Sequence, residues 1–267
     1  MSGSEGEIIL GTVLFLFGAG VVAGLLASTA GLASLVSYPA LLAVGLPPVI
    51  ANVTNTTALI FSGVGATVSS LKELRGHFHQ LVMFVILSLI GSIGGSTLLL
   101  IAPAGSFEKV VPFFILAAAI MLFVSGRQTD NTTERLKAAQ AHPVKRILIR
   151  VASYLGIILV GAYTGYFGAA GGVIFLALLS IILNEDFAVI NAMKNVIAFV
   201  GNLVATIIFI FRSKINWHFA ILMGIGLFIG GYIGPIIVRH VNIKLLRALI
   251  AIAAVGLAID LFVTAYF

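Results

Sequence analysis

Cysteine is absent from the 267-residue chain, so neither a disulfide nor a thiolate metal site can form. Charged residues are also scarce, at 9% of the chain against about 25% in a typical soluble domain. The sequence contains no G-x4-G-K-[S/T] phosphate loop and no H-E-x2-H motif, which argues against ATP hydrolysis and against a zinc protease. We therefore predict no enzymatic activity, no cofactor and no metal site.

Apolar residues dominate what is present: they make up 60% of the sequence, and the mean hydropathy is +1.18. The apolar runs lack the in-and-out alternation of outer-membrane strands, which favours membrane helices. The formal charge of +6 comes from basic residues in short loops, which is typical of topology signals and not of a nucleic-acid surface. Because Met1–Glu7 has no basic residue, we expect a retained first helix instead of a signal peptide.

Ten apolar segments are predicted, so the expected fold class is an all-α polytopic membrane protein. The segments of the first half are Ile8–Ala27, Ala30–Val44, Val49–Leu71, Leu81–Ile101 and Phe107–Val124. Those of the second half are Ile147–Tyr166, Ala169–Leu183, Phe187–Phe211, Phe219–Val238 and Lys244–Tyr266. The second segment of each half is shorter than the roughly 20 residues that a span requires. It is either a short tilted span or part of a re-entrant hairpin.

The two halves resemble each other, which predicts two repeats of five segments at 1–124 and 147–267, joined by a cytoplasmic linker at 125–146. The collinear matches are Gly20, Gly24 and Gly31 with Gly161, Gly165 and Gly172; Asn55 and Ala58 with Asn195 and Ala198; and Gly91 and Gly95 with Gly230 and Gly234. Each half has an odd number of crossings whether its short segment spans or re-enters. The repeats are therefore expected to have inverted topology, the arrangement that underlies alternating access in many transporters.

Charge bias predicts the orientation of the chain. Eleven basic residues are assigned to the inside and three to the outside. The inside residues are Lys72, Arg75, Arg127, Arg135, Lys137, Lys145, Arg146, Arg150, Arg239, Lys244 and Arg247. The outside residues are Lys109, Arg212 and Lys214. The positive-inside rule then places both termini outside a cytoplasmic (inner) membrane.

Two polar motifs interrupt the apolar segments and are the candidate binding site. Asn52, Thr54 and Asn55 open one segment, and Asn191, Lys194 and Asn195 open its counterpart. Uncompensated polar groups are costly in hydrocarbon, so a duplicated cluster suggests a site shared by both halves. The first motif follows Pro47-Pro48 and so begins a helix, whose free N–H groups suit an anion.

Lys194 is the most informative residue, and three interpretations stay open. Its ammonium group is the counter-charge for an anion, an ion-pair partner of Glu185 or Asp186, or a group that snorkels to the interface. The glycine runs that end at Gly31 and at Gly171–Gly172 indicate either close helix packing or helix breaks whose backbone joins the site.

These residues also carry a family resemblance. The first half resembles the sulfite exporter TauE/SafE family in four successive features. They are the glycine-rich segment, then Tyr38-Pro39-Ala40-Leu41, then Ala51-Asn52-x-Thr54-Asn55, and then the basic turn Lys72–Gly76. The second half is similar to the second repeat of that family at Gly168–Gly172, Asn191-Ala192-x-Lys194-Asn195 and Asn216-Trp217. The resemblance implies transport of sulfur oxyanions or organosulfonates, generally as export.

We therefore predict a secondary transporter that exports a small anion, sulfite or an organosulfonate, by alternating access. An anion channel is the alternative, and a scaffolding membrane subunit is a third hypothesis. The expected partners are the anion and the lipid bilayer, without nucleic acid, and a homodimer is left open.

Overall fold

The computed structural model describes residues 3–125, 143–168, 171–183 and 185–238, together with residues 252, 255, 256, 259, 262 and 263. The described chain is all helical. Its helices are α1 (Gly3–Ala30), α2 (Ser34–Ala43), α3 (Pro48–Ser69), α4 (Phe78–Ile101), α5 (Ala104–Ser125), α7 (Pro143–Tyr166), α8 (Gly171–Ile182), α9 (Phe187–Arg212) and α10 (Trp217–Val238). Residues 126–142 of the predicted linker and the predicted segment Lys244–Tyr266 lie outside the described residues, apart from the scattered positions named above.

Several helix boundaries differ from the predicted ones. Ala30 is the last residue of α1, although the sequence places it in the second segment. The reason is that α1 continues helically to the glycine that breaks it. Helix α7 begins at Pro143, within the predicted linker, because proline fits the first position of a helix and the polar residues that follow it are helical too.

The distribution of side chains is that of a membrane protein. Large apolar side chains point outward, for example Leu14, Ile90 and Leu159 with exposed fractions of 61%, 57% and 69%, while Asn55 and Lys194 are buried. Such a surface suits lipid and not water. Six of the described helices are long and apolar enough to cross a membrane. The chain is a multi-pass membrane protein.

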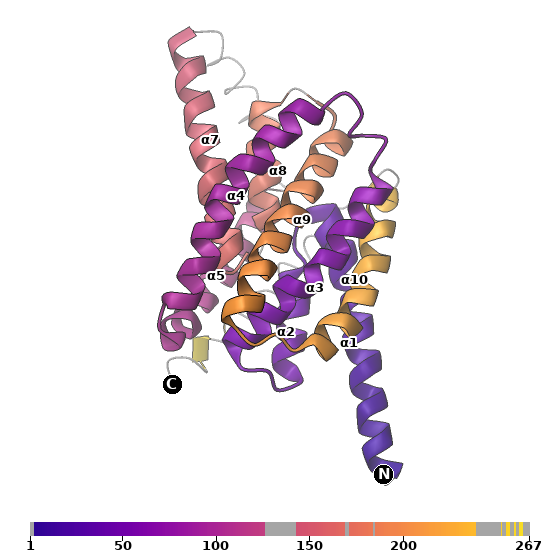
Figure 1. The fold of residues 1–267 in the computed structure, drawn as a ribbon. Coiled ribbons are helices and arrows are strands. Elements are labelled where there is room, and N and C mark those ends of the chain that lie inside the picture. The colour runs from indigo at the N-terminus through magenta and orange to yellow at the C-terminus, as the bar shows by residue number, and fades with distance from the viewer. Residues whose placement is uncertain are drawn as a thin grey trace.

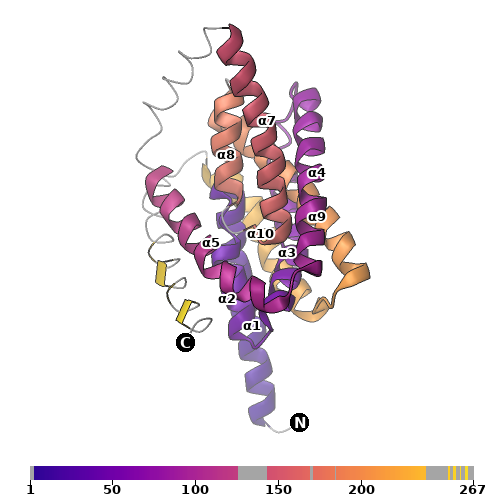
Figure 2. The same ribbon diagram turned by 90° about the vertical axis from the view of Figure 1, so that its left-hand side faces the viewer.

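Helices α2 and α8 are hairpin arms. They have 10 and 12 residues, so they extend about 15 and 18 Å, well short of the roughly 30 Å hydrocarbon core. Helix α1 extends from the lower end of the molecule with α2 beside its upper part, whereas α7 extends from the upper end and α8 returns toward that end (Figures 1 and 2). At the upper end, Glu185 after α8 pairs with His77 before α4 at 3.7 Å. The structure thus favours the hairpin alternative for both short segments.

Two helix pairs pack backbone to backbone through glycines. On α1, a Cβ at Gly20 or Gly24 would collide with the backbone of α10 at Met223 or Leu227. On α7, a Cβ at Gly161 or Gly165 would collide with the backbone of α4. Small residues permit this close approach, which compensates for the weak hydrophobic drive between helices in lipid.

The two interfaces of the fourth helices, α4 and α10, compare differently with the predicted pairing. The sequence pairs Gly91 with Gly230, but in the structure Gly91 faces α7 at Ile158 and Ala162, as Gly226 faces α1 at Phe17 and Val21. At this interface Gly95 matches Gly230. At the other, α4 meets α9 at Ser92 and Gly201 much as α10 meets α3 at Gly231 and Ser62, which is close to the predicted register. Glycines repeated every four residues match equally well when shifted by one turn, so spacing alone does not fix the register.

Candidate functional site

The centre of the molecule contains two broken helices that touch. Helix α1 stops before Gly31 (φ +74°) and α7 stops before Gly168 (φ +75°), a left-handed conformation that glycine adopts without strain. A Cβ on Gly31 would collide with Gly172 at the start of α8, and a Cβ on Gly172 would collide with Gly31. The sequence motifs that end at Gly31 and Gly172 are therefore helix breaks in direct contact.

Three side chains of α9 converge on the C-terminus of α1. Nζ of Lys194 donates to the carbonyl oxygen of Ala27 at 2.8 Å and to that of Ser28 at 3.4 Å. Nδ2 of Asn191 and of Asn195 also donate to the Ser28 carbonyl, at 2.8 and 3.3 Å. The last carbonyls of a helix lack intrahelical donors and carry partial negative charge, so an ammonium group is stabilised there.

Helix α3 makes one corresponding contact with the other break, and two further contacts with α2 and with the residue before α10. Nδ2 of Asn52 donates to the carbonyl oxygen of Tyr166, the last residue of α7, at 2.9 Å. Nδ2 of Asn55 donates to Oγ of Ser34, the first residue of α2, at 3.2 Å. Thr54 accepts a bond from the backbone N–H of Asn216 at 3.1 Å.

A pocket lies between the two breaks. Its space is about 570 Å³, part of which is open to solvent, and its wall comes from α1, α2, α3, α7, α8, α9 and the two breaks. The lining residues are Ala27, Gly31, Ala33, Ser34, Thr56, Leu59, Thr164, Phe167, Gly168, Gly172, Phe175, Lys194, Ala198 and Asn202.

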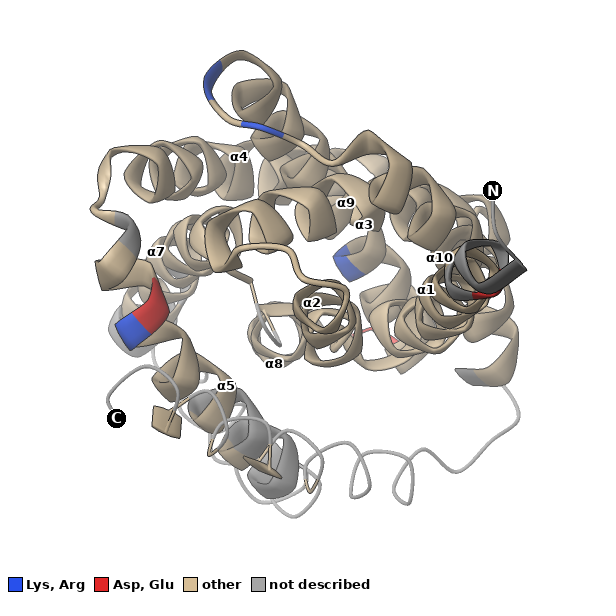
Figure 3. Cartoon of the chain, turned by 90° about the horizontal axis from the view of Figure 1, so that it is seen from below, with Lys and Arg blue, Asp and Glu red and all other residues tan. Residues whose placement is uncertain are grey.

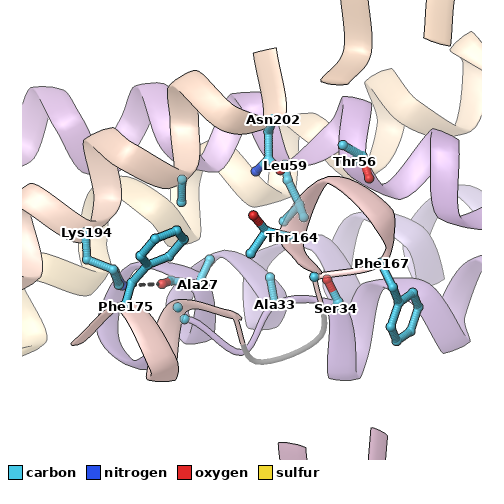
Figure 4. Close-up of a pocket in the computed structure, with 14 residues that line it drawn as sticks. Ala27, Ala33, Ser34, Thr56, Leu59, Thr164, Phe167, Phe175, Lys194 and Asn202 are labelled. Atoms are coloured by element: carbon cyan, nitrogen blue, oxygen red, sulfur yellow. Dashed lines mark hydrogen bonds between the residues drawn. The ribbon is translucent and has the colours of Figure 1, made fainter. Parts of the chain in front are cut away.

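The close-up shows how the chemistry is distributed along the pocket. Lys194 lies at one end near Phe175 and the Ala27 carbonyl, and Phe167 lies toward the other end (Figure 4). Between them lie the polar side chains of Thr164 and Asn202. Helices α2 and α8 both begin at this pocket, and the first N–H groups of a helix favour negative charge.

Lys194 gives the pocket its charge. Among the lining residues that the structure describes it is the only charged side chain, and it is 1% exposed. Seen from below, one Lys or Arg position lies among the helices, and other coloured positions lie toward the edge of the molecule (Figure 3). Glu185 and Asp186 are exposed, and Glu185 lies 3.7 Å from Nδ1 of His77. A buried ammonium group of this kind is not snorkelling to an interface.

The predicted site residues separate into two groups. Gly31, Gly172 and Lys194 line the pocket. The others are buried beside it and hold the helix ends or loops that form its wall: Asn52, Thr54, Asn55, Gly171, Asn191 and Asn195. Sequence reasoning did not single out Asn202, Thr164 or Phe167. Asn202 had a usable signal, since it is an amide within an apolar run.

No metal centre is evident in this region. Within the described ranges, no group of three or more His, Asp or Glu side chains lies close enough to hold a metal ion. The polar groups that line the pocket are an ammonium group, an amide and hydroxyls, of which the ammonium and amide groups suit an anion.

The geometry agrees with what related proteins indicate. A model of the family described as "Sulfite exporter TauE/SafE" matches residues 16–261. The chain belongs to this family. The resemblance found in the sequence is thereby confirmed.

Several relatives match over most of their own length. A "Probable membrane transporter protein ORF9" from Sinorhizobium sp is 29% identical over 92% of this chain and 91% of its own length. A "Probable membrane transporter protein" from Haemophilus influenzae is 26% identical over 92% of each chain. The "Probable membrane transporter protein YfcA" of Escherichia coli K12 is 22% identical over 92% of this chain and 87% of its own. No solved structure gives a significant match.

Proposed function

We propose that this protein is a secondary transporter that exports a small anion, sulfite or an organosulfonate, across the cytoplasmic membrane. The observation that carries the proposal is the buried ammonium group of Lys194 on the wall of a pocket between two broken helices. The family description and the names of the relatives support membrane transport.

Electrostatics explains why the pocket would select an anion. A unit negative charge about 4 Å from Nζ of Lys194 gains about 4 kcal/mol of Coulomb energy at an effective dielectric constant of about 20. The N-termini of α2 and α8 add partial positive charge. The hydroxyl groups of Thr56 and Thr164 already donate to backbone carbonyls, so they orient the anion less than the ammonium and amide groups do.

Alternating access would arise from two inverted repeats, 1–124 and 147–267. The facing glycines support this proposal, because α1 meets α10 through the same spacing with which α7 meets α4. The polar contacts between the two halves are arranged in a similar way. A side chain of α9 donates to a carbonyl at the end of α1, and a side chain of α3 donates to a carbonyl at the end of α7. Movement of one repeat against the other would open the Gly31–Gly172 contact and change which side of the pocket is accessible.

In this scheme Lys194, Gly31 and Gly172 contact the anion, while Gly171 sets the start of α8. Asn191, Asn195, Asn52, Thr54 and Asn55 fix the helix ends around it. We propose both termini outside. The cysteine-free sequence makes this orientation testable. Lys214→Cys is expected to react with an impermeant maleimide in whole cells, and Lys72→Cys only after lysis; the reverse pattern would invert the topology.

Flux measurements test the function. Purified protein in liposomes should take up labelled sulfite with saturation and should show counterflow when the lumen contains unlabelled sulfite. A channel would instead pass non-saturating current without counterflow. Absence of sulfite and sulfonate flux above that of empty liposomes would reject the proposed substrate class.

A further inference from the structure

Three side chains with hydroxyl groups line the pocket, and they differ in what they donate to. Oγ1 of Thr56 donates to the carbonyl oxygen of Asn52 at 3.0 Å. Oγ1 of Thr164 donates to that of Gly161 at 2.9 Å. Ser34 is 3% exposed, and within the described chain its hydroxyl accepts a bond but donates none. A buried O–H group without an acceptor is costly, and a ligand with an accepting atom would remove that cost.

The direction of the bond between Asn55 and Ser34 keeps the hydroxyl proton available. Nδ2 of Asn55 donates to Oγ of Ser34 at 3.2 Å. A hydroxyl group has one O–H donor and two acceptor lone pairs, so Oγ can accept from Asn55 and still donate elsewhere. Asn55 is itself 0% exposed, which fixes this contact on the α3 side of Ser34. A ligand that accepts from Ser34 would complete a chain of two donors that point the same way.

Backbone donors lie beside this hydroxyl. Ser34 is the first residue of α2, and both Ser34 and Ala33 line the pocket. The backbone bonds of this turn start at Leu35 and Val36, whose N–H groups donate at 3.2 and 2.9 Å. The N–H groups of Ala33 and Ser34 make no backbone bond with the described residues. The start of α2 therefore presents a hydroxyl and free N–H groups to the pocket, all of them donors.

Ser34 and Lys194 lie toward opposite ends of the pocket. Figure 4 shows Ser34 on the side of Phe167, with Thr164 between Ser34 and Lys194. Lys194 brings a full charge, whereas the donors at Ser34 are neutral groups. The two ends therefore suit different parts of one molecule, an anionic head at Lys194 and a second accepting group at Ser34.

We propose that Ser34, oriented by Asn55, is a specificity-determining residue. Its hydroxyl donates to an oxygen atom on the carbon chain of an organosulfonate whose sulfonate group lies at Lys194. This step rests on the proposed function, because it uses the same pocket, and it narrows the substrate to a sulfonate with a second oxygen-bearing group. A site built to hydrogen-bond such a group discriminates against an analogue that lacks it, since the buried donors are then left unpaired.

Two sulfonates of equal charge and similar size test the role of Ser34. In 2-hydroxyethanesulfonate a hydroxyl group stands where 1-propanesulfonate has a methyl group. Wild type, as the purified full chain, is expected to bind the hydroxy compound about five- to tenfold more tightly in calorimetric titration, as one added hydrogen bond predicts. Ser34→Ala should lower this affinity ratio to about one. Its affinity for sulfite should stay within about twofold of wild type, because sulfite is held at the Lys194 end.

Thr56→Val is the matched control, because it removes a pocket hydroxyl whose proton is already donated to Asn52. Its affinity ratio should stay within about twofold of wild type. Asn55→Ala should lower the ratio in the wild-type background but not in Ser34→Ala, since a positioning residue acts only through its partner. A merely structural role of Asn55 would instead weaken both sulfonates and sulfite alike. All variants should be monodisperse on size exclusion, and Ser34→Ala against Thr56→Val decides the matter if Asn55→Ala does not fold.

Two results would overturn the role of Ser34 while leaving anion transport intact. One is a ratio near one in folded wild type that still binds both sulfonates. The other is a ratio that Ser34→Ala and Thr56→Val change equally, or that neither changes. A folded wild type that binds neither the sulfonates nor sulfite would reject the proposed function, and the role of Ser34 with it.

Discussion

Replacing Lys194 by methionine should abolish most anion binding without unfolding the protein. Methionine keeps the unbranched length of the side chain but removes the only charge among the described residues that line the pocket. A charged hydrogen bond contributes a net of about 1.5–3 kcal/mol, which is less than the Coulomb energy because desolvation opposes it. Affinity for sulfite should therefore fall about 10- to 150-fold.

The fold should tolerate this substitution because the carbonyls that Lys194 contacts keep other donors. The Ser28 carbonyl still accepts from Asn191 at 2.8 Å, and the Ala27 carbonyl still accepts from the backbone N–H of Gly31 at 2.9 Å. Burial of an ammonium group is itself costly, so an apolar replacement of similar volume is often neutral for stability. We expect the free energy of unfolding to change by no more than about 1 kcal/mol.

The assay pairs sulfite uptake by proteoliposomes with thermal unfolding of the purified protein. Lys194→Arg keeps the charge and should retain more affinity than Lys194→Met, whereas Lys214→Met removes an exposed cation and should leave both readouts unchanged. A folded Lys194→Met protein whose sulfite affinity is within twofold of wild type would refute the counter-charge role. Unfolding of Lys194→Met with normal folding of Lys194→Arg would instead assign Lys194 to holding the end of α1.

Three further predictions concern packing and the pocket wall. Gly95→Ala should lower Tm, since its Cβ would collide with the backbone of α7, at a cost of about 1–3 kcal/mol, whereas its neighbour Gly94→Ala meets open space and should be neutral. Gly31→Ala should abolish a folded, monodisperse protein on size exclusion, whereas Gly45→Ala, with a similar positive φ but open surroundings, should cost only about 1–2 kcal/mol in thermal unfolding. Asn202→Leu should raise the KM for sulfite about three- to tenfold at unchanged Tm, because it removes a neutral pocket donor. Equal effects of Gly95→Ala and Gly94→Ala, or of Gly31→Ala and Gly45→Ala, would contradict the packing arguments. An unchanged KM in Asn202→Leu would contradict its role in the pocket.

The sequence offers helix breaks as one of two interpretations of the glycine runs, because the cause of a break is local. Glycine at positions such as Gly31 and Gly168 is the residue that adopts a positive φ without strain, and the short apolar run that follows cannot cross a bilayer. Lys194 was equally evident, since a cation within an apolar helix requires a partner or a pathway. Both inferences depend on the cost of a single residue in its own environment.

The pocket wall could be predicted only in part because it depends on how distant helices rotate. Thr164 and Phe167 are ordinary residues for an apolar helix, and they line the pocket only because α7 stops beside the end of α1. The pairing of Gly91 depends on helix contacts for a related reason, because a four-residue glycine spacing matches itself after one helical turn. Contacts between helices, and not composition, decide between such alternatives.

Polar groups at the centre of the molecule both donate hydrogen bonds to the broken helix ends and line the pocket. A helix that stops inside the bilayer leaves carbonyls that water cannot reach, so each broken end needs donors from another helix. For α1 those donors include the ammonium group of Lys194, which also lines the pocket. If the pocket binds an anion as we propose, an anion that attracts this group would weaken its hold on α1, and a shift of α1 would change the charge presented to the anion. Because one side chain would serve both contacts, the proposed anion binding would be coupled directly to the position of the helix end.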